Sequence, residues 1–255
     1  MVKMTPQLAE ICGIHAGDGY LRLRNSSKGE LDISGNIEEK GYYDNYVIPL
    51  FNDYFNLKLK GKTFSRGTYG FVIYNKCIAQ FFNEIGFPYG EKSSQVETPK
   101  LILNSNTPEI SSAFLRGLFD TDGCISFRKS YGEKYKEFKR NYHHYPTIRL
   151  STISNKLADN ICFLLNQLKI KYFKWGTKPK KLEYHYIYSV IISGRVNVHK
   201  WMNIIGSKNP VKLSRFDLWK KFGFCQTNTT LNEREDILKN KNLNIIKGPI
   251  VQRIE

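Results

Sequence analysis

Two aspartates, each followed directly by a glycine, close two similar stretches of this chain. Asp18-Gly19 lies in LAEICGIHAGDGYLRLR (8–24), and Asp122-Gly123 ends FLRGLFDTDG (114–123). Both follow an apolar run typical of a buried helix, and a glycine suits the backbone turn after a helix end. An acidic residue is disfavoured there, because a helix C-terminus carries partial negative charge, unless a cation is near. The carboxylates therefore need a chemical explanation.

Small residues precede both aspartates in the same register. They recur at every fourth position and correspond across the two stretches: Ala9 with Ala113, Gly13 with Gly117, and Gly17 with Thr121. Such a stripe runs along one helix face and lets two helix backbones approach closely. We expect the two helices to pair with Gly13 and Gly117 at their interface, so that Asp18 and Asp122 meet at one end.

Two carboxylates at two negative helix ends repel each other, and a hard divalent cation relieves that cost. Mg²⁺ fits best, because it prefers oxygen ligands. Metal ions held by paired carboxylates can activate a water and stabilise the leaving oxygen of a phosphodiester. The aspartates therefore predict metal-dependent phosphodiester hydrolysis.

The rest of the chain repeats more faintly, as helix-strand-strand-helix-strand-strand-helix in each half. We predict an α+β fold with a first half over 1–93, a linker over 94–110 that contains two prolines, a second half over 111–224 and a C-terminal tail over 225–255. The polar stretch KSYGEKYKEFKRNYHHY (129–145) has no counterpart in the first half, and we expect an exposed hairpin loop there.

The charge balance indicates a polyanionic partner. Lys and Arg number 39 against 23 Asp and Glu, a formal net charge of +16. Such an excess favours nucleic acid over an anionic membrane, with solubility alone as the alternative. The five cysteines never form a C-x-x-C pair, and no apolar stretch reaches membrane-spanning length. We expect an intracellular location, in the cytoplasm or in an organelle if the gene is organellar.

The motifs ICGIHAGDG (11–19) and LRGLFDTDG (115–123) resemble the paired signature of the LAGLIDADG homing endonucleases, in their single-chain, two-motif form. The second copy matches closely. The first departs from the pattern with His15 at a usually apolar position and Ala16 where an acid is common. Both copies keep the acid that the family uses for metal binding, as Asp18 and Asp122.

The resemblance implies a pseudo-twofold duplicated αββαββα fold. Two antiparallel β-sheets would form a saddle over the DNA major groove, with the motif helices packed at its centre. It further implies a monomer that makes double-strand breaks at a long, asymmetric target, encoded within a mobile intron. The implied cofactor is Mg²⁺, as two or three divalent ions, with Mn²⁺ or Ca²⁺ able to substitute for binding.

The same resemblance assigns roles to residues around the aspartates. Asp18 and Asp122 would bind metal together with Gly17 and Thr121. Two lysines, Lys92 and Lys212, would assist catalysis, with Lys208 as an alternative to the second.

Basic residues of the predicted strands alternate with apolar ones, which favours a groove lined with positive charge. Arginine can read guanine in the major groove, and lysine more often holds phosphate. For any single residue, a solvated surface charge is the commoner case, and the argument for a groove rests on the set. The candidate DNA-binding residues are Arg22, Arg24, Lys58, Lys60, Lys62, Arg128, Arg149, Lys174, Lys178 and Lys180.

Two other functions compete with DNA cleavage. A protein of this fold can serve as an RNA-splicing maturase, or can bind DNA without cutting it. Retention of both acids favours a nuclease, although binding of intron RNA in addition stays open, because positive charge does not choose between RNA and DNA. An HNH-type nuclease could be argued from His143 and His144, but no suitable partner residues follow them.

Overall fold

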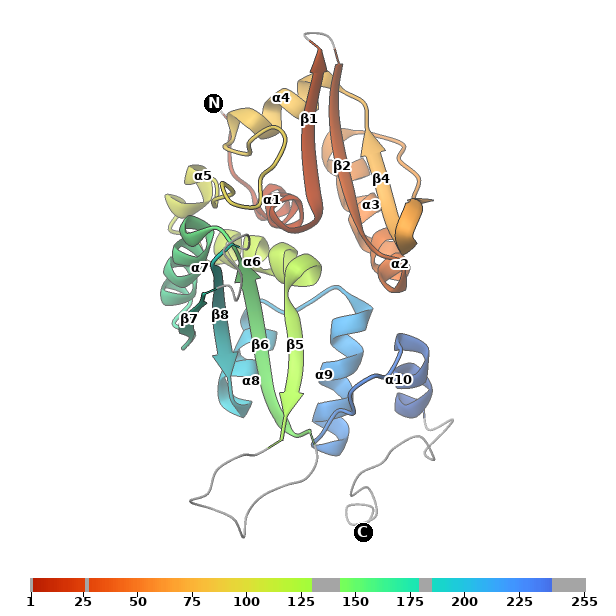
Figure 1. Ribbon diagram of the computed structural model, residues 1–255, viewed down its shortest axis with the longest axis vertical. Helices are drawn as coiled ribbons and strands as arrows, with labels where there is room; N and C mark the ends of the chain where they lie inside the picture. Colours follow the sequence, from red (N-terminus) through yellow and green to blue (C-terminus); the bar gives the residue numbers. More distant parts are fainter. Residues whose placement is uncertain (1, 26–27, 130–142, 179–184, 240–255) are drawn as a thin grey trace.

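The computed structural model describes residues 2–25, 28–129, 143–178 and 185–239. They form two halves with the same order of strands and main helices (Figure 1). The first half contains α1 (Pro6–Asp18), β1 (Gly19–Asn25), β2 (Lys28–Asn36), η1 (Ile37–Glu39), α2 (Lys40–Tyr42), η2 (Tyr43–Val47), α3 (Ile48–Phe55), β3 (Lys62–Thr63), η3 (Ser65–Gly67), β4 (Thr68–Ile73) and α4 (Lys76–Glu84).

The second half repeats this plan with a longer C-terminal part. It contains α6 (Pro108–Asp122), β5 (Cys124–Arg128), β6 (Tyr145–Thr152), α7 (Asn155–Gln167), β7 (Phe173–Thr177), β8 (Ile187–Ser193), α8 (Arg195–Ile204), α9 (Pro210–Phe222) and α10 (Leu231–Leu238). A short helix, α5 (Lys100–Leu103), precedes it within the predicted linker, and α6 begins inside that linker's last residues. Residues 130–142 of the predicted hairpin loop lie outside the described residues.

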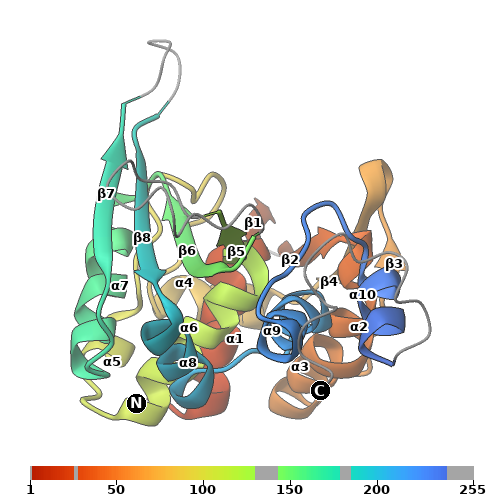
Figure 2. The ribbon, with the colours of Figure 1, turned by 90° about the horizontal axis from the view of Figure 1, so that it is seen from below.

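Each half builds one four-stranded antiparallel sheet, in the order β1-β2-β4-β3 and β5-β6-β8-β7. Helices cover one face of both sheets, with α4 against β1 and β2 and with α7 and α8 against β6 and β8. Figure 2 shows these helices on one side of the sheets and leaves the other face of each sheet open. The predicted fold, two antiparallel sheets around a central helix pair, is confirmed.

The two motif helices, α1 and α6, form the centre of the molecule, and their backbones touch. A Cβ atom on Gly13 would lie 2.1 Å from the Phe114 carbonyl oxygen, and one on Gly117 would lie 2.3 Å from the Glu10 carbonyl oxygen. Only glycine can occupy such positions, because no side-chain atom fits between the backbones. The predicted helix interface at Gly13 and Gly117 is therefore present.

A buried ion pair fastens the same two helices. The Arg116 guanidinium of α6 donates two hydrogen bonds to the Glu10 carboxylate of α1, at 2.8 and 2.5 Å, and the Tyr46 hydroxyl donates a third at 2.8 Å. A bidentate arginine pair of this kind fixes orientation as well as distance. It sets the axial register of α1 against α6, and thus of the two helix ends.

Among the described residues, no helix is long and apolar enough to cross a membrane.

Candidate metal centre and DNA-facing surface

Asp18 and Asp122 end α1 and α6 beside each other. A Cβ atom on Gly17 would lie 3.4 Å from the Asp122 carboxyl carbon. Burial raises the pKa of Asp18 to about 7, with the negative charges of Asp122 and Glu39 adding to the effect and a hydrogen bond from Tyr43 opposing it. Burial also raises the pKa of Asp122, against the positive charges of Lys92 and Lys212. The paired carboxylates are thus driven toward neutrality unless a cation binds them.

The residues at this end of the helix pair fit a Mg²⁺ ion. The described residues contain no group of three or more His, Cys, Asp or Glu placed to hold a metal. Mg²⁺ is usually bound through one or two carboxylates, with waters and substrate phosphates completing its shell. Asp18 and Asp122 can supply such carboxylates, and the charge of the ion would relieve their mutual repulsion.

Two buried lysines cap the C-terminal ends of the motif helices in equivalent ways. Lys92 Nζ donates to the carbonyls of Ala16 and Gly17, at 2.7 and 2.5 Å. Lys212 Nζ donates to the carbonyls of Phe119 and Thr121, the latter at 2.9 Å. Each ammonium therefore lies at the negative end of a helix, where a cation is stabilised.

This arrangement corrects the predicted role of two metal ligands. The backbone carbonyls of Gly17 and Thr121 accept lysine hydrogen bonds, so they are not free groups available to a metal. It also separates Lys212 from Lys208, the alternative second lysine. Lys208 is exposed and places its ammonium over the Tyr46 ring, whereas Lys212 reaches the helix end.

The surroundings give the lysines altered acidity. Burial lowers the pKa of Lys92 to about 8, although the charges of Asp122 and Asp18 work in the opposite direction. Burial lowers the pKa of Lys212 as well. A lysine with a pKa near 8 can exchange a proton near neutral pH, which suits a group that assists phosphate chemistry.

Several polar residues of the site were missed from the sequence. The Tyr43 hydroxyl donates to Asp18 Oδ2 at 2.5 Å. Asn209 donates from Nδ2 both to Glu39 Oε1 at 2.6 Å and to the Asp120 carbonyl at 2.8 Å, and so joins the two halves. The Asp120 carboxylate accepts from Ser207 Oγ at 2.5 Å and from the Lys208 amide at 2.6 Å. Of these residues, only Asp120 had a signal in the sequence, its place within the second motif.

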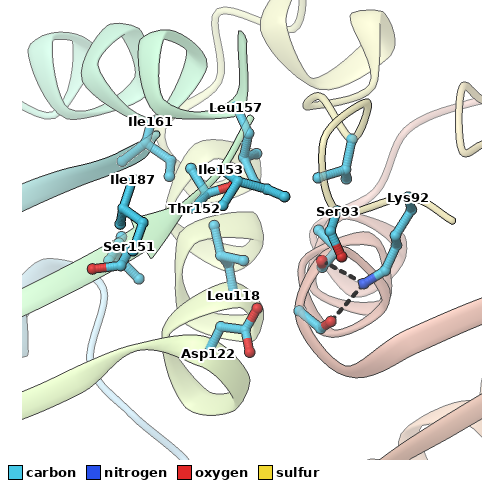
Figure 3. A pocket seen from close by; sticks show the side chains of 14 residues that line it. Lys92, Ser93, Leu118, Asp122, Ser151, Thr152, Ile153, Leu157, Ile161 and Ile187 are labelled. Carbon is cyan, nitrogen blue, oxygen red and sulfur yellow. Dashed lines mark hydrogen bonds between the residues drawn. The ribbon is translucent and has the colours of Figure 1, made fainter. Parts of the chain in front are cut away.

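A cavity of about 420 Å³ opens beside Asp122. Figure 3 shows Asp122 and Lys92 on facing elements at its edge, with Leu157 and Ile161 of α7 among the apolar side chains that line it. The cavity is therefore part of the surroundings of the second carboxylate only.

The strand registers divide the predicted DNA-binding residues between the two faces of each sheet. In the first sheet, buried Leu21, Leu31 and Ile73 face the helices, which leaves Arg22 and Lys62 on the open face. In the second sheet, Arg128 and Arg149 alternate with buried residues in the same way. These four cationic side chains can reach a duplex laid across the open faces.

Lys174 is an exception and corrects the prediction. It pairs with buried Val190 on the helix-covered face, and its ammonium donates to Asp159 at 2.6 Å and Asn155 at 2.8 Å. Since an ion pair already holds it against α7, Lys174 is not part of the open face.

The remaining predicted positions lie away from the sheet centres. Lys58 and Lys60 belong to an irregular segment before β3, not to a strand, and Lys178 follows β7 as an exposed residue. Arg24 lies near the tip of β1. Lys180 lies outside the described residues.

The open face of the second sheet also carries large apolar side chains that the prediction did not include. Phe173 and Trp175 are 58% and 55% exposed and stack on each other, with their ring centroids 6.0 Å apart. The register places them on the same face as Arg149. The two open faces therefore differ in chemistry.

Comparison with known proteins supports the motif resemblance. Residues 109–206 match the LAGLIDADG-like domain family. Three curated relatives are a replication factor C small subunit of Methanocaldococcus jannaschii (27% identical over 82% of this chain), an A-type ATP synthase subunit of Pyrococcus abyssi (28% over 76%) and a replicative DNA helicase DnaB of Rhodothermus marinus (30% over 51%). The matched stretches span 10%, 16% and 12% of those proteins.

Solved structures share the fold at low sequence identity. A variant of the homing endonuclease I-DmoI is 15% identical, with a TM-score of 0.54 over 80% of this chain and 97% of that one. I-DmoI in complex with DNA and Mn has a TM-score of 0.53, with 15% identity, over 79% of this chain and 96% of its own. A lysine mutant of I-SmaMI is 12% identical, with a TM-score of 0.55 over 94% and 97% of the two chains. The resemblance to the two-motif LAGLIDADG family is thereby confirmed.

Proposed function

From a chain with the two-motif LAGLIDADG fold, we propose a site-specific DNA endonuclease that hydrolyses phosphodiesters with the help of a divalent metal. The observation that carries this proposal is the meeting of Asp18 and Asp122 where α1 and α6 end, between two sheets that each expose arginine. A groove-binding surface and a pair of metal-binding acids thus share one side of the molecule. The product would be a double-strand break.

Each group in the site has a distinct task in this mechanism. Asp18 and Asp122 would hold Mg²⁺, which would act as a Lewis acid on the phosphate and lower the pKa of an attacking water. Lys92 and Lys212 place positive charge beside the phosphate and offset the negative helix ends. The lowered pKa of Lys92 allows it to give or take a proton near neutral pH.

The metal preference is supported by the oxygen ligands themselves and by solved relatives. Structures of I-DmoI with its DNA contain Mn, Ca or Mg, according to their descriptions. We propose the same class of ion here, with Mg²⁺ as the working metal, and with two or three ions per complex.

The target would be long and asymmetric. The first open face presents Arg22, Asp32 and Lys62, whereas the second presents Arg149 with the Phe173 and Trp175 rings. Arginine reads guanine, an acidic side chain accepts from cytosine, and apolar side chains contact the thymine methyl group. Two such different faces favour two different half-sites, and a single chain can bind both as a monomer.

The curated relatives bear on how such a gene could travel. Three proteins with unrelated names share this stretch as a small part of their length. This distribution supports a self-contained module with its own activity. We propose a mobile element as its source, either the expected intron or an element read in frame within a longer protein.

A selection from randomised DNA tests the proposal. Plasmids that carry a random insert are incubated with the protein and Mg²⁺, and linear product is recovered and sequenced. We expect a single long, non-palindromic consensus, cut by the parent and not by Asp18→Asn or Asp122→Asn. DNA binding without any nicked or linear product would favour a non-cleaving DNA-binding protein, and intron splicing by the chain would favour a maturase.

A further inference from the structure

The two carboxylates of the site have different surroundings, although the fold around them is duplicated. The Tyr43 hydroxyl donates to Asp18 Oδ2 at 2.5 Å. Strand β2 closes on the same oxygen, because a Cβ atom on Gly35 would lie 2.6 Å from Asp18 Oδ2, 2.8 Å from the Tyr43 hydroxyl and 3.2 Å from Glu39 Oε2. One oxygen of Asp18 is thus fixed by the protein, and the other remains for a cation.

Asp122 lacks such a support among the described residues. No hydrogen bond from a described residue reaches its carboxylate, and it lies at the edge of the 420 Å³ cavity (Figure 3). Leu157 and Ile161 line that cavity from the helix that follows the second strand of the sheet. Tyr43 lies on the corresponding part of the first half.

The backbone explains how the first half differs. Tyr43 begins η2, the one π-helical turn among the described residues, whereas α7 is a regular α-helix. A π turn inserts one residue into a helix and re-aims the side chains around it, and such turns are frequent at functional sites. Tyr43 is also buried, with its ring against the edge of Tyr42 and its hydroxyl in the site.

We propose that Tyr43 is a positioning residue that holds Asp18 ready for its metal ion, and that the two DNA strands are therefore cut with unequal dependence on the metal. This rests on the proposed nuclease function. Hydrogen-bonded partners of ligating carboxylates orient them, and loss of such a partner weakens metal binding or activity about 10–100-fold. In the described part of the chain, Asp122 has no such partner to lose, so the effect falls on one side of the site.

The test compares two adjacent tyrosines. Tyr43→Phe removes the hydroxyl that contacts Asp18. Tyr42→Phe is the matched control, because the buried Tyr42 hydroxyl has no hydrogen-bond partner among the described residues. Parent and variants cut a target duplex with a different label on each strand, in single-turnover reactions over a range of Mg²⁺ concentrations. We expect Tyr43→Phe to slow one strand about 10–100-fold at low Mg²⁺, with nicked duplex accumulating, and Tyr42→Phe to behave like the parent.

A binding measurement separates this inference from the nuclease proposal. Calorimetric titration of the protein–DNA complex with Ca²⁺ should show weaker binding for Tyr43→Phe by a similar factor. If the parent cuts neither strand, the nuclease proposal fails, and the titration still decides the role of Tyr43. Equal slowing of both strands, or unchanged Ca²⁺ affinity, would overturn the inference. Partial unfolding of the variant cannot imitate it, because loss of folded protein slows both strands alike.

Discussion

Alanine at Gly117 should separate the two motif helices, although it adds only one methyl group. The new Cβ atom would lie 2.3 Å from the Glu10 carbonyl oxygen and 2.8 Å from the Ile14 nitrogen, where ordinary contact begins near 3.4 Å. Both neighbours are backbone atoms of α1, so no side chain can rotate away. The helices must move apart by about 1 Å, and the well-packed surface between them loses contact along its whole length.

The magnitude follows from two opposing terms. Alanine favours a helix over glycine by up to about 1 kcal/mol. Overpacking a core usually costs about 1–3 kcal/mol, and a clash between two backbones belongs at or beyond the upper end of that range. We expect a net loss of about 2 kcal/mol or more in the free energy of unfolding. For a chain of this size, that lowers the melting temperature by roughly 4–8 °C.

Gly41→Ala is the matched control, because it makes the same change in α2. Among the described residues, a Cβ atom there meets only Asn45 Nδ2, at 4.0 Å. Without a clash, the helix preference alone remains, and we expect a gain of about 0.4–1 kcal/mol. Urea unfolding of parent and both variants measures the difference. If Gly117→Ala is as stable as Gly41→Ala, the close approach of α1 and α6 is not the feature that holds the halves together.

Three further predictions concern the acids, the buried histidine and the DNA surface. Asp18→Asn or Asp122→Asn should each abolish double-strand cleavage yet keep most DNA affinity, measured by gel shift; a parallel loss of binding would make the acids structural. Burial lowers the pKa of His15 well below 6.5, so the unfolded chain gains a proton below pH 6.5 that the folded chain refuses. Stability should therefore fall by up to about 1.4 kcal/mol per pH unit between pH 6.5 and the folded pKa. His15→Leu should remove that loss in urea unfolding at pH 7 and pH 5, and an equal loss in parent and variant would contradict it. DNA affinity should fall with salt at a log–log slope of about −0.9 per phosphate contact, and Arg22→Ala or Arg149→Ala should relax base preference at one position by about 1–3 kcal/mol. An affinity indifferent to salt would exclude the open faces as the binding surface.

The helix pair could be predicted because its signal is local. Small residues at every fourth position define one helix face whatever surrounds the helix. Two copies in one register imply a pair, and the acid after each copy then follows to a common end. The equivalence of Lys92 and Lys212 came from the family resemblance, and both ammonium groups lie on motif-helix carbonyls.

Other parts of the site depend on contacts that the sequence does not encode locally. Tyr43 reaches Asp18 only because η2 is a π turn, which no residue pattern in that segment announces. Asn209 meets Glu39 across 170 positions of chain, through the pairing of the two halves. The face occupied by Lys174 depends on strand register, and a shift of one residue reverses every side chain of a strand.

The comparison of the two halves shows which features the duplicated fold holds constant. Each motif helix ends in an acid, and each acid-bearing end receives a buried lysine on its carbonyls. The groups around them differ, with Tyr43 on one side and an open cavity on the other. The open sheet faces differ as well, in charge and in aromatic content. A nuclease that cuts both strands needs the same acids twice, whereas an asymmetric target needs two different reading surfaces. The constant and variable parts of this chain divide along that line.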